Sequence, residues 1–298
     1  MDALPIYAAL GASTTWAIAA IIAYSPTRSL GAFTFVKIQV LSCSILVLSF
    51  CFLTDRFNTI DWGYWPAYLV SGVVGVLITN ISLSVCVRRG GPRRAALLST
   101  SKALFAAVIS FVFLGEKMSI ESQLGCIVVT IGIIVAIVLN KPHKNSHVLE
   151  SVDGSISIII GTGLLAGFSQ AIGILALKKP ILEGLDPIMA AGIRLSVCSV
   201  AIICFDILRQ EPIFPKLENN KVMALVAILP GFMGYVVAAG LLLYAVGQRN
   251  SAEMFILSSL SPILIIPFQW IITRQNIGLG VWLGTFLVVV GTYLLVKS

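Results

Sequence analysis

The sequence has little charge: 11% of its 298 residues are Asp, Glu, Lys or Arg, whereas 58% are hydrophobic. Soluble domains typically contain about 25% charged residues. This imbalance excludes an ordinary soluble domain. Apolar runs of about 20 residues, each long enough to cross the ~30 Å hydrocarbon core of a bilayer, recur along the whole chain. We therefore interpret the chain as an integral, multi-pass membrane protein.

Common enzyme and metal-binding motifs are also missing. The chain has no GxxxxGK[ST] segment, so direct nucleotide hydrolysis is excluded as its energy source, and it has no HExxH zinc motif. Its six cysteines all lie in apolar runs without CxxC spacing, which argues against a zinc site or a disulfide framework. The net charge of +7 comes from residues scattered over loops, which does not indicate nucleic-acid binding. We predict no enzyme activity, no cofactor and no metal.

The apolar residues form ten predicted transmembrane helices separated by short polar loops. We expect an all-α fold with no separate soluble domain. The predicted spans cover residues 5–24, 31–53, 65–87, 94–114, 120–139, 155–177, 187–208, 222–247, 252–272 and 277–296.

The second half of the chain repeats the pattern of the first. A shift of 159 residues places Gly72 on Gly231 and aligns LGCIVVTIGIIVAIV with LGTFLVVVGTYLLV; further upstream, a shift of 155 places KIQVLSCS on GIRLSVCS. Five helices per copy is an odd number, so the second copy must enter the membrane from the opposite side, as in many secondary transporters. We predict two inverted five-helix repeats, at residues 1–140 and 155–298, joined by a polar linker at 141–154.

The ten spans, the FLGEK segment that closes the fourth and SxLSPIL in its counterpart resemble the drug/metabolite transporter superfamily, in particular its EamA-type carriers. The resemblance covers essentially the whole chain and implies a carrier fold, but it does not specify a substrate. Gln275 and Asn276 stand where the first copy has Glu116 and Lys117, so the pattern is not symmetric. Nucleotide-sugar transporters of this superfamily have a Lys in the fourth helix that recognises phosphate. The resemblance implies the same role for Lys102.

Three basic residues, Lys37, Lys102 and Arg194, lie inside predicted spans, whereas no acidic residue lies well inside one. At 1.5 Å per residue, all three are within about 5 to 6 Å of the bilayer midplane. A Lys or Arg at a helix centre costs roughly 2.5 to 3.5 kcal/mol, which makes a buried one a functional candidate. Snorkelling of the lysines to the headgroups, and structural hydrogen bonds of Arg194 to helix-end carbonyls, are the alternatives.

Seven uncharged residues complete the predicted substrate site. Ser99 lies one helical turn from Lys102, and its repeat counterpart Ser258 lies near Ser261, so that facing helices would present hydroxyls beside the ammonium. The other four are Gln39, Asn80, Gln170 and Tyr235, which supply donors, acceptors and a ring. Each of these four is also a candidate for helix-to-helix hydrogen bonding.

These features favour a secondary transporter that exports or exchanges a small polar metabolite, anionic or zwitterionic, bearing a carboxylate or phosphate. One alternative is an amino-acid exporter with a mainly apolar and aromatic pocket; another is a non-transporting lipid-binding or assembly subunit. The expected partners are the substrate, membrane lipid and protons as a candidate coupling ion, in a monomer or homodimer of a bacterial inner membrane. Loop Lys and Arg are more numerous opposite the termini, which places that face in the cytoplasm.

Overall fold

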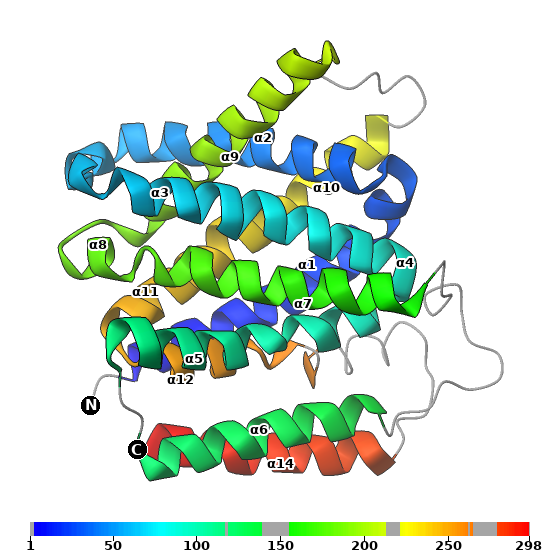
Figure 1. Cartoon of the computed structure of the whole chain (residues 1–298), viewed down its shortest axis with the longest axis vertical. Helices are drawn as coiled ribbons and strands as arrows, with labels where there is room; N and C mark the ends of the chain where they lie inside the picture. The colour runs from blue at the N-terminus through cyan, green and yellow to red at the C-terminus, as the bar shows by residue number, and fades with distance from the viewer. Residues whose placement is uncertain are drawn as a thin grey trace.

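The structure is a computed structural model that describes residues 3–116, 119–138, 155–212, 221–261, 263–264 and 279–297. Within these ranges all regular secondary structure is helical (Figure 1). In the first half the α-helices are α1 (Leu4–Leu30), α2 (Ala32–Leu53), α3 (Trp65–Gly72), α4 (Thr79–Ser99), α5 (Ser101–Leu114) and α6 (Ile120–Val138). In the second half they are α7 (Ile156–Leu175), α8 (Lys178–Leu182), α9 (Pro187–Arg209), α10 (Lys221–Gly231), α11 (Ala239–Gln248), α12 (Ser251–Ser258) and α14 (Leu279–Lys297).

Six of the predicted spans correspond to helical stretches that are long and apolar enough to cross a membrane, namely Leu4–Leu30, Ala32–Leu53, Trp62–Gly91, Ile156–Leu182, Pro187–Arg209 and Lys221–Gln248. The spans predicted at 94–114, 120–139 and 277–296 correspond to α5, α6 and α14, whose apolar stretches Ser101–Leu114, Gln123–Gly132 and Trp282–Gly291 are shorter. The span predicted at 252–272 begins with α12, and most of its remainder lies outside the described residues, as does the predicted linker.

A break in the helix comes just before the predicted fourth span. The backbone is non-helical at Gly91, where φ is +79°, a conformation that glycine adopts without the steric penalty of a side chain. Within the span, α4 ends at Ser99 and α5 begins at Ser101. Lys102 therefore lies in the first turn of α5, close to a helix end.

Two long helices contain a wider π-helical turn that the sequence analysis did not predict. The segment η3 (Val73–Ile78) follows α3, and η5 (Phe232–Ala238) follows α10. The two segments begin 159 residues apart, which is the shift that aligns the two halves of the sequence. π-Helical turns are rare and are often found at functional sites.

The helices pack in pairs that join the two halves of the chain. α6 lies along α14, while α2 packs against α9, α5 against α12, α4 on α7 and α11 on α1 (Figure 1). The closest crossing is at Gly75 and Gly173, where a Cβ on Gly75 would lie 2.5 Å from the Gly173 Cα. Side chains larger than hydrogen would push α7 away from η3, so this crossing depends on glycine.

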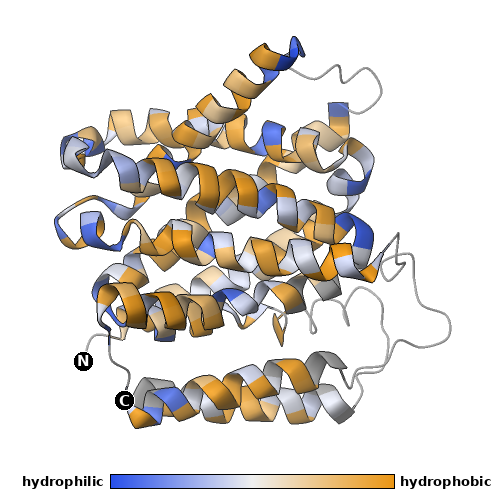
Figure 2. Cartoon of the chain, viewed as in Figure 1, coloured by the Kyte–Doolittle hydropathy of each residue, from blue (hydrophilic) through white to orange (hydrophobic). Residues whose placement is uncertain are grey.

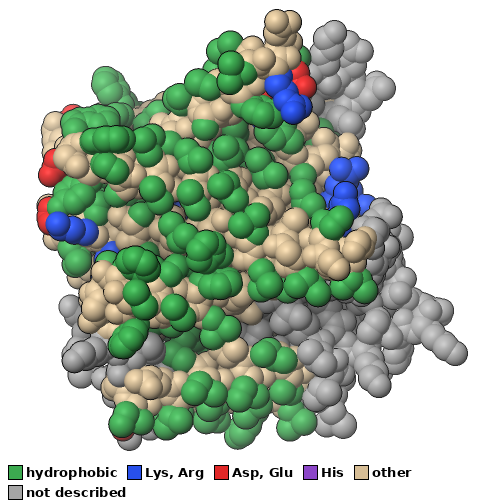
Figure 3. Space-filling view, in the orientation of Figure 1, with side chains coloured by type: hydrophobic (Ala, Val, Ile, Leu, Met, Phe, Trp, Pro, Cys, Tyr) green, Lys and Arg blue, Asp and Glu red, His purple; other side chains and the backbone are tan. Residues whose placement is uncertain are grey.

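On the face shown in Figure 3, the described surface is mostly apolar along the helices, and Figure 2 shows that the hydrophilic residues gather mostly at the helix ends. Helix α5 illustrates the division: Leu104, Val108 and Phe111 are exposed, whereas Lys102 and Ser110 are buried. The helix thus turns apolar side chains outward, as expected toward lipid, and its ammonium inward.

Candidate substrate cavity

A cavity of about 180 Å³ lies between the helices of the two halves. Trp16 and Thr27 of α1, Asn80 of α4 and Pro230 of α10 are among the residues that line it. It extends from the middle of the bundle toward the ends of α1 and α4 that lie opposite the chain termini. Among the described residues, no Asp or Glu contributes to its wall.

Eight of the ten predicted site residues line this one cavity: Gln39, Asn80, Ser99, Lys102, Gln170, Arg194, Tyr235 and Ser261. The other two, Lys37 and Ser258, do not line it. The predicted residues that meet at the cavity are thus drawn from seven of the predicted spans.

The ammonium of Lys102 points into the bundle and does not snorkel to a membrane surface. Its Nζ lies 4.0 Å from the centroid of the Trp16 ring and 3.5 Å from the main-chain oxygen of Ser258, and the residue is only 4% exposed. Helix α12 ends at Ser258, so this oxygen belongs to the negative end of that helix. In the part of the chain that the structure describes, no carboxylate forms an ion pair with Lys102.

We expected the hydroxyl of Ser258 to lie beside the ammonium of Lys102. In the structure it is the backbone oxygen of Ser258 that does so. Its hydroxyl donates a hydrogen bond to the Phe255 oxygen at 2.8 Å, within its own helix. The neighbouring hydroxyl of Ser261, which does line the cavity, lies 3.3 Å from the Ser258 oxygen and 3.4 Å from the Ser13 hydroxyl.

Arg194 is 4% exposed and donates from Nη2 to the oxygen of Gly75, at 3.3 Å, in the π-helical segment η3. The alternative role for Arg194 was a hydrogen bond to helix-end carbonyls, whereas this acceptor lies inside a helical stretch. Its Nε is buried without a hydrogen-bond partner among the described residues. A buried, unpaired donor of a charged group is costly, so the guanidinium is only partly satisfied by the protein.

Three of the predicted polar residues make hydrogen bonds that shape the wall. The Gln39 amide donates to the Ala227 oxygen at 2.9 Å and accepts from the Tyr235 hydroxyl at 3.1 Å, which ties α2 to the second half. The Asn80 amide donates to the Val76 oxygen at 2.7 Å, within the segment that contains the π-helical turn. The bonds of Gln39 fit the role of helix-to-helix glue, whereas the Asn80 bond stays within its own helical stretch, and each residue contributes to the cavity surface.

The expectation that Lys37 adds positive charge to the site is wrong. Its Nζ lies 2.6 Å from a carboxylate oxygen of Asp206 and donates to the Pro212 oxygen at 2.8 Å. Asp206 is 0% exposed, although its place near the end of α9 indicated a residue near the membrane surface. The pair joins α2 to α9 and neutralises both charges.

At the end of the bundle that carries the termini, polar side chains connect the two halves. Glu116, the acid of FLGEK, pairs with Lys178 and accepts hydrogen bonds from the Ser251 backbone N–H at 2.9 Å and hydroxyl at 3.0 Å. Nearby, Tyr64 of the first half donates to Glu183 of the second. All of these residues lie between the predicted spans.

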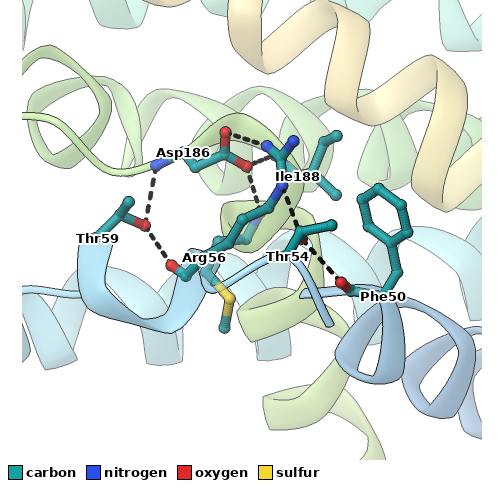
Figure 4. Close-up of polar contacts among 7 residues, drawn as sticks. Phe50, Thr54, Arg56, Thr59, Asp186 and Ile188 are labelled. Atoms are coloured by element: carbon teal, nitrogen blue, oxygen red, sulfur yellow. Dashed lines mark hydrogen bonds and ion pairs between the residues drawn. The ribbon is translucent and has the colours of Figure 1, made fainter. Parts of the chain in front are cut away.

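A further contact of this kind involves Arg56 and Asp186 (Figure 4). Arg56 also donates to the Thr54 hydroxyl at 3.1 Å, and Thr59 accepts from the Asp186 backbone N–H at 3.3 Å. Asp186 caps α9 through hydrogen bonds from the Ile188 and Met189 N–H groups. The Asp186 carboxylate thus caps the start of α9 and also links the two halves through Arg56.

Comparison with known proteins agrees with this architecture. The model of the EamA-like transporter family matches residues 3–138 and 157–297. An uncharacterized transporter of Synechocystis sp., sll0355, is 20% identical over 271 residues, which cover 87% of this chain and 79% of that protein. A crystal structure of a protein that is 15% identical superposes with a TM-score of 0.71, covering 99% of this chain and 96% of the other, and so shares its fold. The chain belongs to the EamA-like transporter family, within the drug/metabolite transporter superfamily.

Proposed function

We propose that this protein exports or exchanges a small polar metabolite, anionic or zwitterionic, that bears a carboxylate or a phosphate. The observation that carries this proposal is the presence of Lys102 and Arg194 on the wall of one cavity, where the described residues supply no carboxylate. In a low-dielectric interior two uncompensated cations favour an anion and oppose a cation.

The size of the cavity supports a metabolite over a drug. Pockets for drug-sized ligands are typically about 300 to 1,000 Å³, whereas this cavity measures about 180 Å³. Amide and hydroxyl groups of Gln170, Asn80 and Ser261 lie on the same wall and would orient the polar part of such a ligand.

The proposed mechanism is rocking of two inverted repeats, residues 1–140 and 155–298, around the cavity. Its support is structural: the two π-helical turns begin at positions that match under the 159-residue shift. A Cβ on Gly72 would lie 3.0 Å from the oxygen of Arg194, and a Cβ on its counterpart Gly231 would lie 2.9 Å from the Cβ of Gln39. The 155-residue shift places Gln39 on Arg194, so the two glycines approach matching positions of the two halves. In this arrangement the Glu116 and Arg56 contacts hold the halves together at the end of the termini.

An amino-acid exporter is the second candidate, because Trp16, Phe35 and Leu195 give part of the cavity an apolar and aromatic wall. An amino acid has the carboxylate that Lys102 or Arg194 would bind, and an apolar side chain would fit this wall. It would also bring an ammonium into a cavity whose charges are positive, so the first proposal fits the charges better.

Flux into sealed proteoliposomes tests this proposal. Purified protein is reconstituted in a bacterial inner-membrane lipid extract, the location we propose, and counterflow of labelled phosphorylated compounds, dicarboxylates, amino acids and organic cations is measured. We expect saturable counterflow of at least one anion and none of the cations. Counterflow of cations alone would contradict the proposal, and binding of lipid without flux of any compound would favour a non-transporting protein.

A further inference from the structure

The ring of Trp16 and the end of helix α12 form a site of the kind that binds organic cations. A cation within about 6 Å of an indole centroid is attracted to the negative face of the ring, and Lys102 Nζ lies 4.0 Å from this centroid. The Ser258 oxygen adds the negative end of a helix from another direction, at 3.5 Å. The Trp16 ring and the Ser258 oxygen thus flank one position, and the ammonium of Lys102 occupies it.

The surroundings hold this arrangement in place. A Cβ on Gly234 would lie 3.7 Å from the Cδ1 and Nε1 atoms of Trp16, so the edge of the ring rests close to segment η5. On the other side, a Cβ on Gly167 would lie 3.0 Å from the backbone nitrogen of Lys102, so α5 is pressed against α7 at this residue. Both the ring and the base of the lysine are therefore positioned by close helix contacts.

We propose that Lys102 is a tethered cation that occupies an aromatic cation-binding site in the cavity wall, and that this occupancy determines the charge selectivity of the cavity. This inference rests on the proposed function, because both concern the charge of the ligand that the same cavity binds. While the lysine is present, the indole face is not available to a cationic ligand, and the ammonium presents positive charge to an anionic one. Trp16 is on this view a positioning residue for Lys102.

The proposal predicts that removal of the lysine side chain opens the site to an external cation. The Lys102→Ala variant should bind n-propylammonium, which resembles the lost part of the side chain, at least about tenfold more tightly than the wild type, since a desolvated cation–π contact supplies this much affinity. Addition of Trp16→Leu to this variant should abolish the gain. The Lys102→Arg variant is the matched control, because a guanidinium keeps the ring occupied and should give no gain.

Binding is measured as ligand-induced thermal stabilisation of the purified, full-length protein in detergent, with the unfolding transition of each variant without ligand as the test of folding. Lys102→Met, which keeps most of the side-chain volume, provides a second uncharged variant whose tryptophan emission should differ from that of the wild type through loss of the cation at Trp16. Equal n-propylammonium affinities for Lys102→Ala and the wild type would overturn the inference, as would a gain that persists with Trp16→Leu.

The two proposals fail in different ways. If the wild type binds no anion but Lys102→Ala gains n-propylammonium binding, the proposed function is wrong and the tethered cation stands. If the wild type binds anions and Lys102→Ala gains no cation binding, the tethered cation is wrong and the proposed function stands.

Discussion

Lys37 and Lys102 have the same exposure, 4%, and both lie in apolar helices, but their surroundings differ. Lys37 has a buried carboxylate, Asp206, at 2.6 Å, and a carbonyl oxygen. Lys102 has a tryptophan ring and a carbonyl oxygen at 3.5 Å. Burial of a charge in a membrane helix therefore does not by itself identify a binding site; the chemistry of its partners does.

The partners of the two lysines differ in how easily a ligand can replace them. Removing one member of a buried ion pair leaves an uncompensated charge, which typically costs about 3 to 5 kcal/mol. A cation–π contact contributes about 0.5 to 2 kcal/mol, so an incoming carboxylate or phosphate can compete with the ring for the ammonium. We therefore assign Lys37 to stability and propose that Lys102 acts in binding.

The largest expected effect is on the ion pair. Asp206→Asn should lower the free energy of unfolding by about 3 to 5 kcal/mol, because the ammonium of Lys37 then stays buried without its counter-charge. Thermal unfolding in detergent measures this change, and the double variant Lys37→Met/Asp206→Leu should recover most of the loss. Wild-type stability of Asp206→Asn would show that the pair is not important for the fold.

The next effect separates the two lysines by function. Lys102→Gln should reduce anion affinity by about tenfold or more, since a charge-assisted hydrogen bond to the ligand contributes about 1.5 to 3 kcal/mol. Without ligand, the free energy of unfolding of Lys102→Gln should differ less from the wild-type value than that of Asp206→Asn. Full retention of anion-induced stabilisation in Lys102→Gln would remove this residue from the proposed site.

A smaller effect is expected at the contacts between the halves. Glu116→Gln weakens the pairing with Lys178 and the bonds from Ser251, so the start of α12 should open more often. Hydrogen exchange in this segment should become roughly tenfold faster, as for the loss of about 1.5 kcal/mol. Exchange that increases equally throughout the protein would indicate general destabilisation and not a local link between the halves.

The smallest effect is expected for Ser258→Ala. Because the hydroxyl bonds within its own helix and only the backbone oxygen contacts Lys102, anion affinity should stay within about twofold of the wild type, and stability should change by about 1 kcal/mol or less. Ser261→Ala, which changes a hydroxyl on the cavity wall, is the matched comparison. A larger loss of affinity for Ser258→Ala than for Ser261→Ala would contradict this account of the two serines.

Hydropathy predicted the six long apolar stretches that could cross a membrane, and eight of the predicted site residues line one cavity, but the sequence could not predict the partners of these residues. Asp206 lies three residues before Arg209, where α9 ends, and only tertiary packing against α2 shows that it is fully buried. The same holds for Glu116, whose partners come from two other segments.

The π-helical turns were missed for a different reason. A single extra residue per turn leaves the hydropathy of an all-apolar helix unchanged, and the apolar side chains of η3 and η5 give no periodicity to disturb. Gly75 and Gly234, which lie inside the two segments, are also 159 residues apart in the sequence, but glycine is common at plain helix crossings too. Such turns are therefore a property of the packed structure more than of the local sequence.

The central claim is that the cavity selects negative charge through Lys102 and Arg194. Its most direct test is calorimetric titration of the purified wild-type protein with a panel of small carboxylates and phosphates, each paired with its uncharged amide or ester. We expect measurable binding of at least one anion, and its neutral analogue should bind at least about tenfold more weakly. Equal binding of the charged and uncharged members of every pair, or binding of organic cations alone, would contradict it.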